Sequence, residues 1–545
     1  MNTIAASRLG LTLRRSATQR RKRLLKAVLL HSARATAFAR RWRDSSAHLT
    51  TWGALWVFVV ASLATRAAFA HAGFLNVDEA AHLLGARTLL DGGVLYVDFV
   101  DNKPPLVYVV YAAAQTIFGE GLMSVRLMGA LVLIPGTALA ASAFHGHGRR
   151  GLASGLAFVV ASASLLAADV HAVHCEQVML LPLAWSVVLM RARRFRRRPL
   201  RLLGAGALVG VAALAKQPAL AFLAPIALVI LLDSTPLARR LGHGALLVVG
   251  AALPWAAFGL WMGCSGSLNE AIFWIWRFNA SHVDNPMPLR DQLGRVLLFG
   301  SGLLPSMLPL GLAWSLGRSH VLRERLWLLA LLAAAVVPAL LGMRLFGHYF
   351  LPAVFILALP AGPFFARRTR LRRHVAVGGL ATLCLIVVTA VGLGVHNPAA
   401  AIADVSGPSY EHIGRELGAR ARRDANEACT VFVWGYAPMI YVYADTRAAS
   451  RFVVPLDSLS GYLAGNDAAI EGRLDTATRI RVDHWDALMA DLRARRPCYI
   501  VDTAPADLNR WGHFPISRFP RLSEVIDRDY VFDGRVDGAT IYARR

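Results

Sequence analysis

The chain has 545 residues, of which 56% are hydrophobic and 17% are charged, and its mean hydropathy is +0.46. This composition is too apolar for a soluble globular protein and implies a membrane protein. The formal net charge of +25 would also suit a nucleic-acid-binding protein, but the distribution of the charge argues against that class. Residues 396–545 hold 19 Arg and 20 acidic residues, so the surplus lies earlier, in the first 50 residues and in short loops. We therefore expect no nucleic-acid partner.

The first 50 residues hold 12 Lys or Arg and one acidic residue, Asp44. We expect residues 1–50 to be a basic cytoplasmic tail, disordered or lying at the membrane surface. A cleaved signal peptide is the alternative reading of the first apolar stretch, because Ala68-Phe69-Ala70 resembles a cleavage site. A basic leader of this length is far too long for a signal peptide.

Eleven apolar stretches between residues 52 and 395 suit a hydrocarbon core about 30 Å thick, although some are short. They cover residues 52–70, 122–144, 151–168, 177–190, 202–217, 218–232, 243–262, 296–316, 326–342, 349–366 and 375–395. The sequence thus predicts a mostly α-helical, polytopic transmembrane domain over residues 51–395. A further stretch, Pro104 to Phe118, is shorter, and counting it as a span would invert every later loop against its charge. We expect it to form a surface or re-entrant helix.

The loops between these stretches differ in charge, and the difference predicts the topology. One set of loops holds 19 cations and only two acidic residues, Asp233 and Glu324. Loops rich in Lys and Arg remain in the cytoplasm. The alternating loops hold nine cations and eleven acids. We therefore expect a bacterial inner-membrane protein with its N-terminus in the cytoplasm and its C-terminus on the extracytoplasmic side.

Residues 396–545 have the pattern of a soluble α/β domain, which we expect to be periplasmic. The periodicity predicts helices over residues 411–426 and 484–496 and buried strands over residues 430–434 and 499–502. The end of the chain, residues 530–542, is predicted to form a hairpin that turns near Asp533-Gly534.

The five cysteines form no metal-binding or redox motif by their spacing. Cys429 and Cys498 each stand at the head of a predicted strand in an oxidising compartment, so they would form a disulfide if the two strands are neighbours. Alternatively, they are two small buried hydrophobic residues. The sequence alone does not decide between the two.

The first outward loop is dense with polar groups. Asp78 and Glu79 follow the first span by a few residues, and Lys103 comes later, fixed by Pro104 and Pro105. Such acids can supply a general base, and such a lysine can bind a phosphate at the same interface. The alternative is an ordinary solvated loop.

Several motifs resemble, in their order and spacing, the bacterial relatives of dolichyl-phosphate-mannose protein mannosyltransferases and of aminoarabinose transferases. The motifs are Asp78-Glu79-Ala80, residues 93–98, Asp101-Asn-Lys-Pro-Pro-Leu106, Arg344-Leu-Phe-Gly-His348-Tyr349-Phe-Leu-Pro352 and Val433-Trp434-Gly435-Tyr436. Each motif alone is a weak signal, and their combination carries the resemblance. It implies a GT-C fold, a polyprenyl-phosphate sugar donor and an acidic residue in the first outward loop that acts on the acceptor.

The resemblance also implies the residues of the site. Asp78 falls at the first acidic position, with Glu79 beside it, and Glu176 falls at the second, in the next outward loop; these three are the predicted catalytic residues. The predicted substrate-binding residues lie on the same side of the membrane: Lys103, Asp101, Tyr96, Lys216, Arg344, His348 and Tyr349. The cations among them would hold a lipid phosphate, although Lys216 and Arg344 at span ends would equally suit cations that snorkel to the interface.

Two further features of the outward loops leave alternatives open. His171, His174 and Cys175 crowd the loop around Glu176, which makes a divalent metal conceivable, but such a cluster is more often a polar helix end. No cofactor is therefore required by the sequence. Trp274, Trp276, Arg277 and Asn279 would line a sugar or lipid groove or belong to an aromatic belt.

We therefore expect an integral-membrane glycosyltransferase that moves a sugar from a polyprenyl-phosphate donor to an envelope lipid, glycan or protein outside the membrane. The chain contains no phosphate-binding G-x-x-x-x-G-K-[ST] loop. The alternative is a multi-span secondary transporter or lipid flippase, but transporters place their charges near the bilayer midplane, whereas here the acids gather in outward loops. A non-catalytic assembly protein is a third class. The sugar, the acceptor and the oligomeric state are not encoded in any motif.

Overall fold

The computed structural model describes residues 51–69, 72–165, 171–191, 199–232, 235–280, 287–316, 322–366, 408–423, 429–455 and 457–545. The expected basic tail, the expected span over residues 375–395 and the expected domain boundary at residue 395 lie outside these ranges. By its internal contacts the chain divides into two compact units, Met1–Trp56 and Val57–Arg545, and the description below concerns the second.

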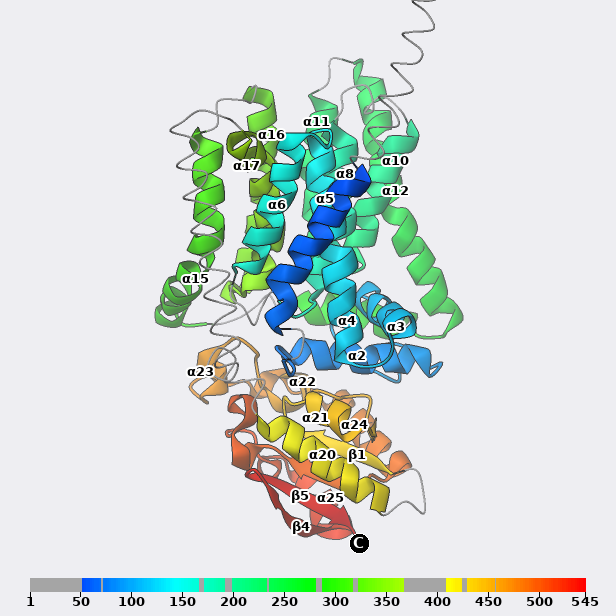
Figure 1. The fold of residues 1–545 in the computed structure, drawn as a ribbon. Helices are drawn as coiled ribbons and strands as arrows, with labels where there is room; N and C mark the ends of the chain where they lie inside the picture. The colour runs from blue at the N-terminus through cyan, green and yellow to red at the C-terminus, as the bar shows by residue number, and fades with distance from the viewer. Residues whose placement is uncertain are drawn as a thin grey trace, which may run out of the picture. The chain divides into compact units, whose positions relative to one another are not determined.

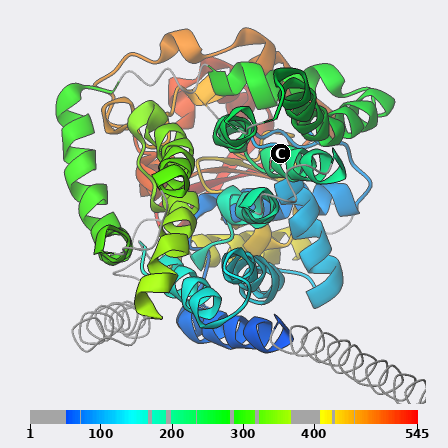
Figure 2. The same cartoon turned by 90° about the horizontal axis from the view of Figure 1, so that it is seen from above.

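The first part of this unit is helical, and most of its long helices run side by side (Figure 1). Seen after a turn of 90°, several of them lie close to end-on (Figure 2). The helices are α2 (Val77–Leu90), α3 (Leu106–Phe118), α4 (Leu122–Met128), α5 (Ile134–Phe144), α6 (Arg149–Ala163), α8 (Cys175–Arg191), α10 (Pro199–Ala213), α11 (Leu223–Leu231), α12 (Leu237–Cys264), α13 (Leu268–Ile272), α15 (Leu289–Leu316), α16 (Leu322–Leu340) and α17 (Leu351–Phe365). Short π and 3-10 turns join several of them: η2 (Gly129–Leu133), η3 (Gln217–Phe222), η4 (Phe273–Phe278), η5 (Leu341–Met343) and η6 (Gly347–Phe350).

Four helical segments in the described part are long and apolar enough to cross a membrane: Leu122–Phe144, Leu237–Cys264, Leu322–Met343 and Gly347–Phe365. A fifth would be the bent pair Leu289–Leu304 and Ser306–Leu316. Each of the five falls on a stretch that the sequence predicts to span. The other predicted spans in the described part fall on shorter helices, so the expected total of eleven is not established by helix length.

Small residues bring α10 and α12 into close contact. A Cβ atom added to Gly206 or Gly210 would collide with the backbone carbonyls of Leu247 and Ala251 on α12. In a membrane, such four-residue spacing of glycines lets two helix backbones approach and gain van der Waals contact.

Helix α2 runs across the direction of the long helices (Figure 1), and α3 packs against it. The 13 residues of α3 would cover about 20 Å at 1.5 Å per residue, which is less than the hydrocarbon thickness of about 30 Å. Val107, Tyr108 and Tyr111 on one face of α3 are buried. This length suits the prediction that residues 104–118 do not span the membrane.

The C-terminal part is an α/β domain with one five-stranded sheet in the order β2-β1-β3-β5-β4. Strands β1, β2 and β3 are parallel, whereas β5 pairs antiparallel with both β3 and β4. Its elements are α20 (Pro408–Arg423), β1 (Thr430–Trp434), α21 (Met439–Ala444), β2 (Arg447–Ala448), α22 (Asp457–Ser460), α23 (Asp467–Ile470), α24 (Val482–Arg495), β3 (Tyr499–Asp502), α25 (Pro520–Asp529), β4 (Tyr530–Val536) and β5 (Ala539–Arg544). Both predicted strands have the predicted bounds, and both predicted helices lie within a few residues of theirs.

The C-terminal hairpin turns four residues later than predicted. The turn is at Asp537-Gly538, where both residues have positive φ (47° and 86°), as a two-residue hairpin loop requires. The other Asp-Gly pair, Asp533-Gly534, lies inside β4, where the register shifts between Phe532 and Gly534. Two identical dipeptides thus serve as a turn and as a β-bulge, and residue type alone does not distinguish these uses.

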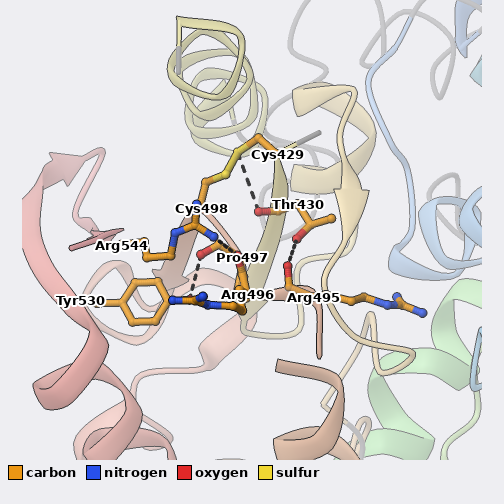
Figure 3. The surroundings of a disulfide bond; sticks show 8 residues. All are labelled: Cys429, Thr430, Arg495, Arg496, Pro497, Cys498, Tyr530 and Arg544. Atoms are coloured by element: carbon orange, nitrogen blue, oxygen red, sulfur yellow. Dashed lines mark hydrogen bonds between the residues drawn. A yellow bond between two sulfur atoms is a disulfide. The ribbon is translucent and has the colours of Figure 1, made fainter. Parts of the chain in front are cut away.

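A disulfide joins Cys429 and Cys498, whose Cα atoms are 5.6 Å apart (Figure 3). The two residues immediately precede β1 and β3, which pair with Val431 opposite Tyr499. The Cys498 N–H also donates a hydrogen bond of 2.8 Å to the Thr430 carbonyl. The disulfide therefore fixes the amino ends of two neighbouring strands, and the first of the two alternatives for these cysteines is confirmed.

Several polar contacts join the C-terminal domain to the helical part. The Val100 N–H donates a 3.0 Å hydrogen bond to the Arg451 carbonyl. Ion pairs link Arg295 to Asp467 at 3.4 Å and Arg473 to Asp291 at 3.1 Å. These contacts hold the domain against the loop before α3 and against the start of α15.

Candidate active site

The N-terminus of α2 positions Asp78. The Asn76 side chain caps the helix by accepting a 2.9 Å hydrogen bond from the Asp78 N–H. Asp78 lies in the first helical turn, where the helix dipole favours a carboxylate. Its side chain is 26% exposed, so the carboxylate is held in place but remains accessible.

Glu79, the neighbour of Asp78, has a different environment. Its side chain is fully buried, and its carboxylate accepts a 2.9 Å hydrogen bond from the Leu75 N–H and pairs with Arg126 on α4 at 3.4 Å. Arg126 also donates to the carbonyls of Phe69 and Gly73 at 2.7 Å. The pair thus anchors the segment that leads into α2.

The Asp101-Asn-Lys turn is fixed by its own polar groups. The Asp101 carboxylate accepts hydrogen bonds from the Asn102 N–H (2.6 Å) and the Tyr108 hydroxyl (2.9 Å). The Tyr96 hydroxyl donates to the Lys103 carbonyl at 2.9 Å. These bonds direct the Lys103 ammonium toward Asp78, 4.0 Å away.

A second carboxylate and a second lysine meet nearby. Lys216, which precedes η3, donates a hydrogen bond to Glu176 in the first turn of α8. Its ammonium also lies 3.6 Å from the centre of the Tyr349 ring, a cation–π distance. Glu176 is almost fully buried, at 3% exposure, so the ion pair compensates for burial of both charges.

Two stacked histidines connect the carboxylates. The His174 and His348 rings are parallel to within 8°, with centroids 3.8 Å apart. The His174 Nδ1 atom lies 4.0 Å from the Asp78 carboxylate, and the His348 Nε2 atom lies 4.0 Å from that of Glu176. Asp78 and Glu176 therefore belong to one continuous array of polar side chains.

Both carboxylates and both lysines line a cavity of about 730 Å³. Eight of the ten predicted site residues line it: Asp78, Asp101, Lys103, Glu176, Lys216, Arg344, His348 and Tyr349. Another part of the wall is apolar and comes from η4 and α16, including Ile275, Trp276, Ala335 and Ala339. The cavity thus combines an acidic and basic centre with a surface suited to an aliphatic chain.

The two remaining predicted residues, Glu79 and Tyr96, are not among those that line the cavity. Glu79 is held by Arg126, and Tyr96 is buried with a positive φ of 69°. Glu79 is the sequence neighbour of Asp78, and Tyr96 is hydrogen-bonded to the Lys103 carbonyl, so both residues support residues that line the cavity. The sequence does not show that Glu79 and Tyr96 lie outside the cavity lining, because both belong to the same motifs as residues that line it.

Electrostatics keep Asp78 ionised. Burial alone would raise the pKa of Asp78, but the Lys103 ammonium and the neighbouring histidines hold that pKa well below its usual value. Arg344 is the least engaged cation of the site: its Nε and Nη2 atoms are buried and have no hydrogen-bond partner among the described residues. Such a group is suited to binding an anion.

The C-terminal domain supplies cavity residues that sequence reasoning did not assign to the site. They are Val453, Val454, Asp457, Tyr462, Ala464, Gly465 and Asn509, together with Tyr436 from one of the motifs. Asn102 and Asn279 also line the cavity and are hydrogen-bonded to each other. Tyr436, Asn102 and Asn279 had been noted in the sequence, whereas the others carry no local signal.

Within the described ranges, no three His, Cys, Asp or Glu residues lie close enough together to hold a metal ion. The histidines of the Glu176 loop face different partners. His171 stacks on Phe69 with centroids 4.0 Å apart, whereas His174 stacks on His348.

The fold is similar to that of solved GT-C glycosyltransferases. Residues 102–259 match the family model of the dolichyl-phosphate-mannose-protein mannosyltransferases. The chain is similar to ArnT from Cupriavidus metallidurans bound to undecaprenyl phosphate, with a TM-score of 0.56, 16% identity, and coverage of 90% of this chain and 98% of ArnT.

The apo form of the same ArnT gives a TM-score of 0.55 and 17% identity, with the same coverage. The Archaeoglobus fulgidus oligosaccharyltransferase in its apo form gives a TM-score of 0.45 and 13% identity, covering 91% of this chain and 74% of that one. A search of curated protein sequences found no match. The resemblance noted in the sequence motifs is therefore confirmed at the level of fold and partial family match.

Proposed function

We propose that the protein is an integral-membrane glycosyltransferase that takes a sugar from a polyprenyl-phosphate donor and transfers it to an envelope acceptor outside the membrane. The main support for this proposal is that two carboxylates and three cations line one cavity beside an apolar wall. They are Asp78, Glu176, Lys103, Lys216 and Arg344. Carboxylates, phosphate-binding cations and a lipid surface are the groups that this reaction needs. Undecaprenyl phosphate, the ligand of the similar ArnT, has the corresponding chemistry.

The three cations of the cavity have different roles. Lys103 and Arg344 hold the phosphate of the donor. Among the described residues, the Arg344 Nε and Nη2 atoms have no hydrogen-bond partner, and the Lys103 ammonium is paired with Asp78 and Asn102 alone. Lys216 is engaged by Glu176 and orients that carboxylate. His348 and Tyr349, which pack against this pair, complete the wall next to the phosphate.

The reaction is a displacement at the anomeric carbon. An acceptor oxygen or nitrogen attacks that carbon, the bond from the carbon to the phosphate oxygen breaks, and the phosphate leaves with the bonding electrons. Asp78 accepts the proton of the acceptor as general base. Lys103 and Arg344 stabilise the charge that develops on the leaving phosphate.

Donor binding makes Asp78 a better base. In the free protein the Lys103 ammonium is the main charge that lowers the pKa of Asp78. When the singly charged phosphodiester of the donor pairs with Lys103, that influence weakens and the pKa of Asp78 rises toward its ordinary value. The carboxylate therefore becomes more basic only when the donor is in place.

We also propose the expected topology, with about eleven spans, a cytoplasmic N-terminus and a periplasmic C-terminal domain in the bacterial inner membrane. Two observations on the C-terminal domain support its periplasmic location. The C-terminal domain lines the cavity and carries the disulfide between Cys429 and Cys498. Disulfides persist in the periplasm and are rare in the cytoplasm. The basic loops lie on the opposite set of connections in the sequence.

A deletion strain tests this function. Mass spectrometry of its envelope lipids and glycans should find one sugar modification missing and one polyprenyl-phosphate sugar accumulated, both restored by the wild-type gene. An unchanged envelope with an altered distribution of a lipid between the two leaflets would instead favour a flippase.

A further inference from the structure

The parallel strands of the C-terminal domain all point their carboxyl ends at the cavity. Tyr436 follows β1, Val453 and Val454 follow β2, and Asn509 follows β3, and all four line the cavity. The amino ends of β1 and β3 are tied by the disulfide, at the other end of the same strands. The sheet therefore presents one defined edge to the site.

The strand order gives this edge a further significance. From β1 the chain first passes to β2 on one side and then returns to β3 on the other side, which gives the local order β2-β1-β3. In open α/β sheets, ligands bind outside the carboxyl ends of the strands at the point where the order reverses. Here that point lies between β1 and β3, where the Thr503 N–H donates to the Trp434 carbonyl at 3.1 Å.

Tyr436 is held at this point through its backbone carbonyl and its ring. Its carbonyl accepts a 2.6 Å hydrogen bond from the Asn509 side chain, and its ring stacks on Tyr462 with centroids 5.0 Å apart. The Tyr462 hydroxyl in turn donates to the Asn509 carbonyl at 3.0 Å. The Tyr436 hydroxyl makes no hydrogen bond with any residue that the structure describes.

Tyr436 also lies close to the reacting groups. Burial raises the pKa of Tyr436, and the Asp78 carboxylate raises it further, with Lys103 acting in the opposite direction. The tyrosine therefore belongs to the electrostatic environment of Asp78, although it comes from a different domain. At neutral pH it is a neutral hydrogen-bond donor.

We propose that the carboxyl ends of these strands form a saccharide subsite in which Tyr436 positions a sugar ring against Asp78. This inference rests on the proposed function, and it assigns a binding role to the C-terminal domain. A sugar ring has apolar C–H faces and a rim of hydroxyls. The Tyr436 ring offers a complementary face, and its hydroxyl and the Asp457 carboxylate, both of which line the cavity, offer partners for the rim.

The sugar has two sources, the donor and the acceptor, and the test has one arm for each. In the first arm, native mass spectrometry in detergent compares binding of undecaprenyl phosphate with binding of undecaprenyl phosphate that carries one hexose or pentose. The wild type should bind at least one sugar-loaded lipid about fivefold or more tightly than the bare lipid. In the second arm, methyl glycosides are added to protein saturated with that sugar-loaded lipid.

The variants are Tyr436→Ala and Tyr436→Phe, with Tyr542→Ala and Tyr542→Phe as controls on β5, outside the cavity lining. Tyr436→Ala should abolish the sugar-dependent gain and leave the affinity for bare undecaprenyl phosphate within about twofold of the wild type. Tyr436→Phe should lose part of the gain, because it keeps the ring and removes the hydroxyl. The controls should behave as the wild type.

Dependence on Tyr436 in the first arm assigns the subsite to the donor sugar, and dependence only in the second arm assigns it to the acceptor. If neither arm depends on Tyr436 while the bare lipid still binds, the subsite is refuted and the proposed function stands. If the wild type binds neither lipid, the proposed function fails, and the subsite fails with it.

Discussion

Asp78→Asn is the most informative single substitution. It preserves the size of the side chain and one oxygen, but it removes the negative charge and the ability to accept a proton from the acceptor. A general base typically contributes about 10²–10⁴-fold to the rate. We therefore expect turnover to fall at least about a hundredfold, while expression, membrane insertion and donor binding are retained.

The structure adds an expectation for donor binding. The Asp78 carboxylate lies 4.0 Å from the Lys103 ammonium, and both side chains are about a quarter exposed. At this distance a unit charge pair is worth about 1 kcal/mol in water and about 4 kcal/mol near a protein surface. Removing the carboxylate frees Lys103 and removes repulsion of the phosphate, so affinity for undecaprenyl phosphate should rise by about fivefold or more.

The assay combines turnover of a synthetic polyprenyl-phosphate sugar with binding of undecaprenyl phosphate, both by protein in detergent. Glu79→Gln is the matched control, because Glu79 is adjacent but is engaged by Arg126 outside the cavity lining. It should lower stability more than the turnover of the folded fraction. Wild-type turnover by Asp78→Asn would refute the role of Asp78 as base.

Four further outcomes are expected. Lys103→Ala and Arg344→Ala should each weaken binding of undecaprenyl phosphate at least about tenfold. The control Arg277→Ala, at an exposed residue outside the cavity lining, should leave binding unchanged. Wild-type affinity in Lys103→Ala and Arg344→Ala would contradict the phosphate site. Glu176→Gln leaves Lys216 without its carboxylate and should cost about 3–5 kcal/mol of stability, much of it recovered in the double variant with Lys216→Gln; thermal unfolding measures both, and no recovery would contradict the pairing. Cys429→Ser should cost the C-terminal domain about 2–4 kcal/mol, seen as increased proteolysis, whereas Cys264→Ser, at an exposed free cysteine, should have no effect; equal protease resistance of both variants would contradict a stabilising disulfide. Burial lowers the pKa of His484 from 6.5 to about 4. Between these pH values the folded state binds fewer protons than the unfolded state, so stability falls as the pH drops from about 6.5 to 4. The melting temperature of His484→Phe should fall less than that of the wild type over this range, and an identical fall would refute the role of His484 in this pH dependence.

The sequence predicted the parts of the fold that depend on local periodicity and charge. Strands β1 and β3 have the predicted bounds because each contains a short run of buried apolar residues, Val431–Trp434 in β1 and Tyr499–Val501 in β3. The predicted span over residues 122–144 also has the same bounds as the apolar helical segment Leu122–Phe144. The hairpin turn was misplaced because Asp533-Gly534 and Asp537-Gly538 have the same local signal, and only the pairing of β4 with β5 distinguishes them.

The sequence motifs predicted most of the candidate site in the helical part of the chain. Asp78, Lys103, Glu176 and Arg344 line one cavity, as the resemblance implied. Motif membership did not separate the residues that line the cavity from those behind it, because the adjacent acids Asp78 and Glu79 belong to one motif but have different partners, Lys103 and Arg126. Asn509 and Asp457 were not predicted, since their place depends on the docking of the C-terminal domain and not on their neighbours in sequence.

The measurement that tests the central claim most directly is transfer of a labelled sugar in vitro. The donor is the polyprenyl-phosphate sugar that accumulates in the deletion strain, the acceptor is the envelope fraction of that strain, and the catalyst is the protein in detergent. The account predicts that the wild type moves the label from the lipid phosphate to the envelope fraction, leaving free polyprenyl phosphate, and that Asp78→Asn does so at least about a hundredfold more slowly. Label that stays on the lipid phosphate in the presence of folded wild-type protein would contradict it.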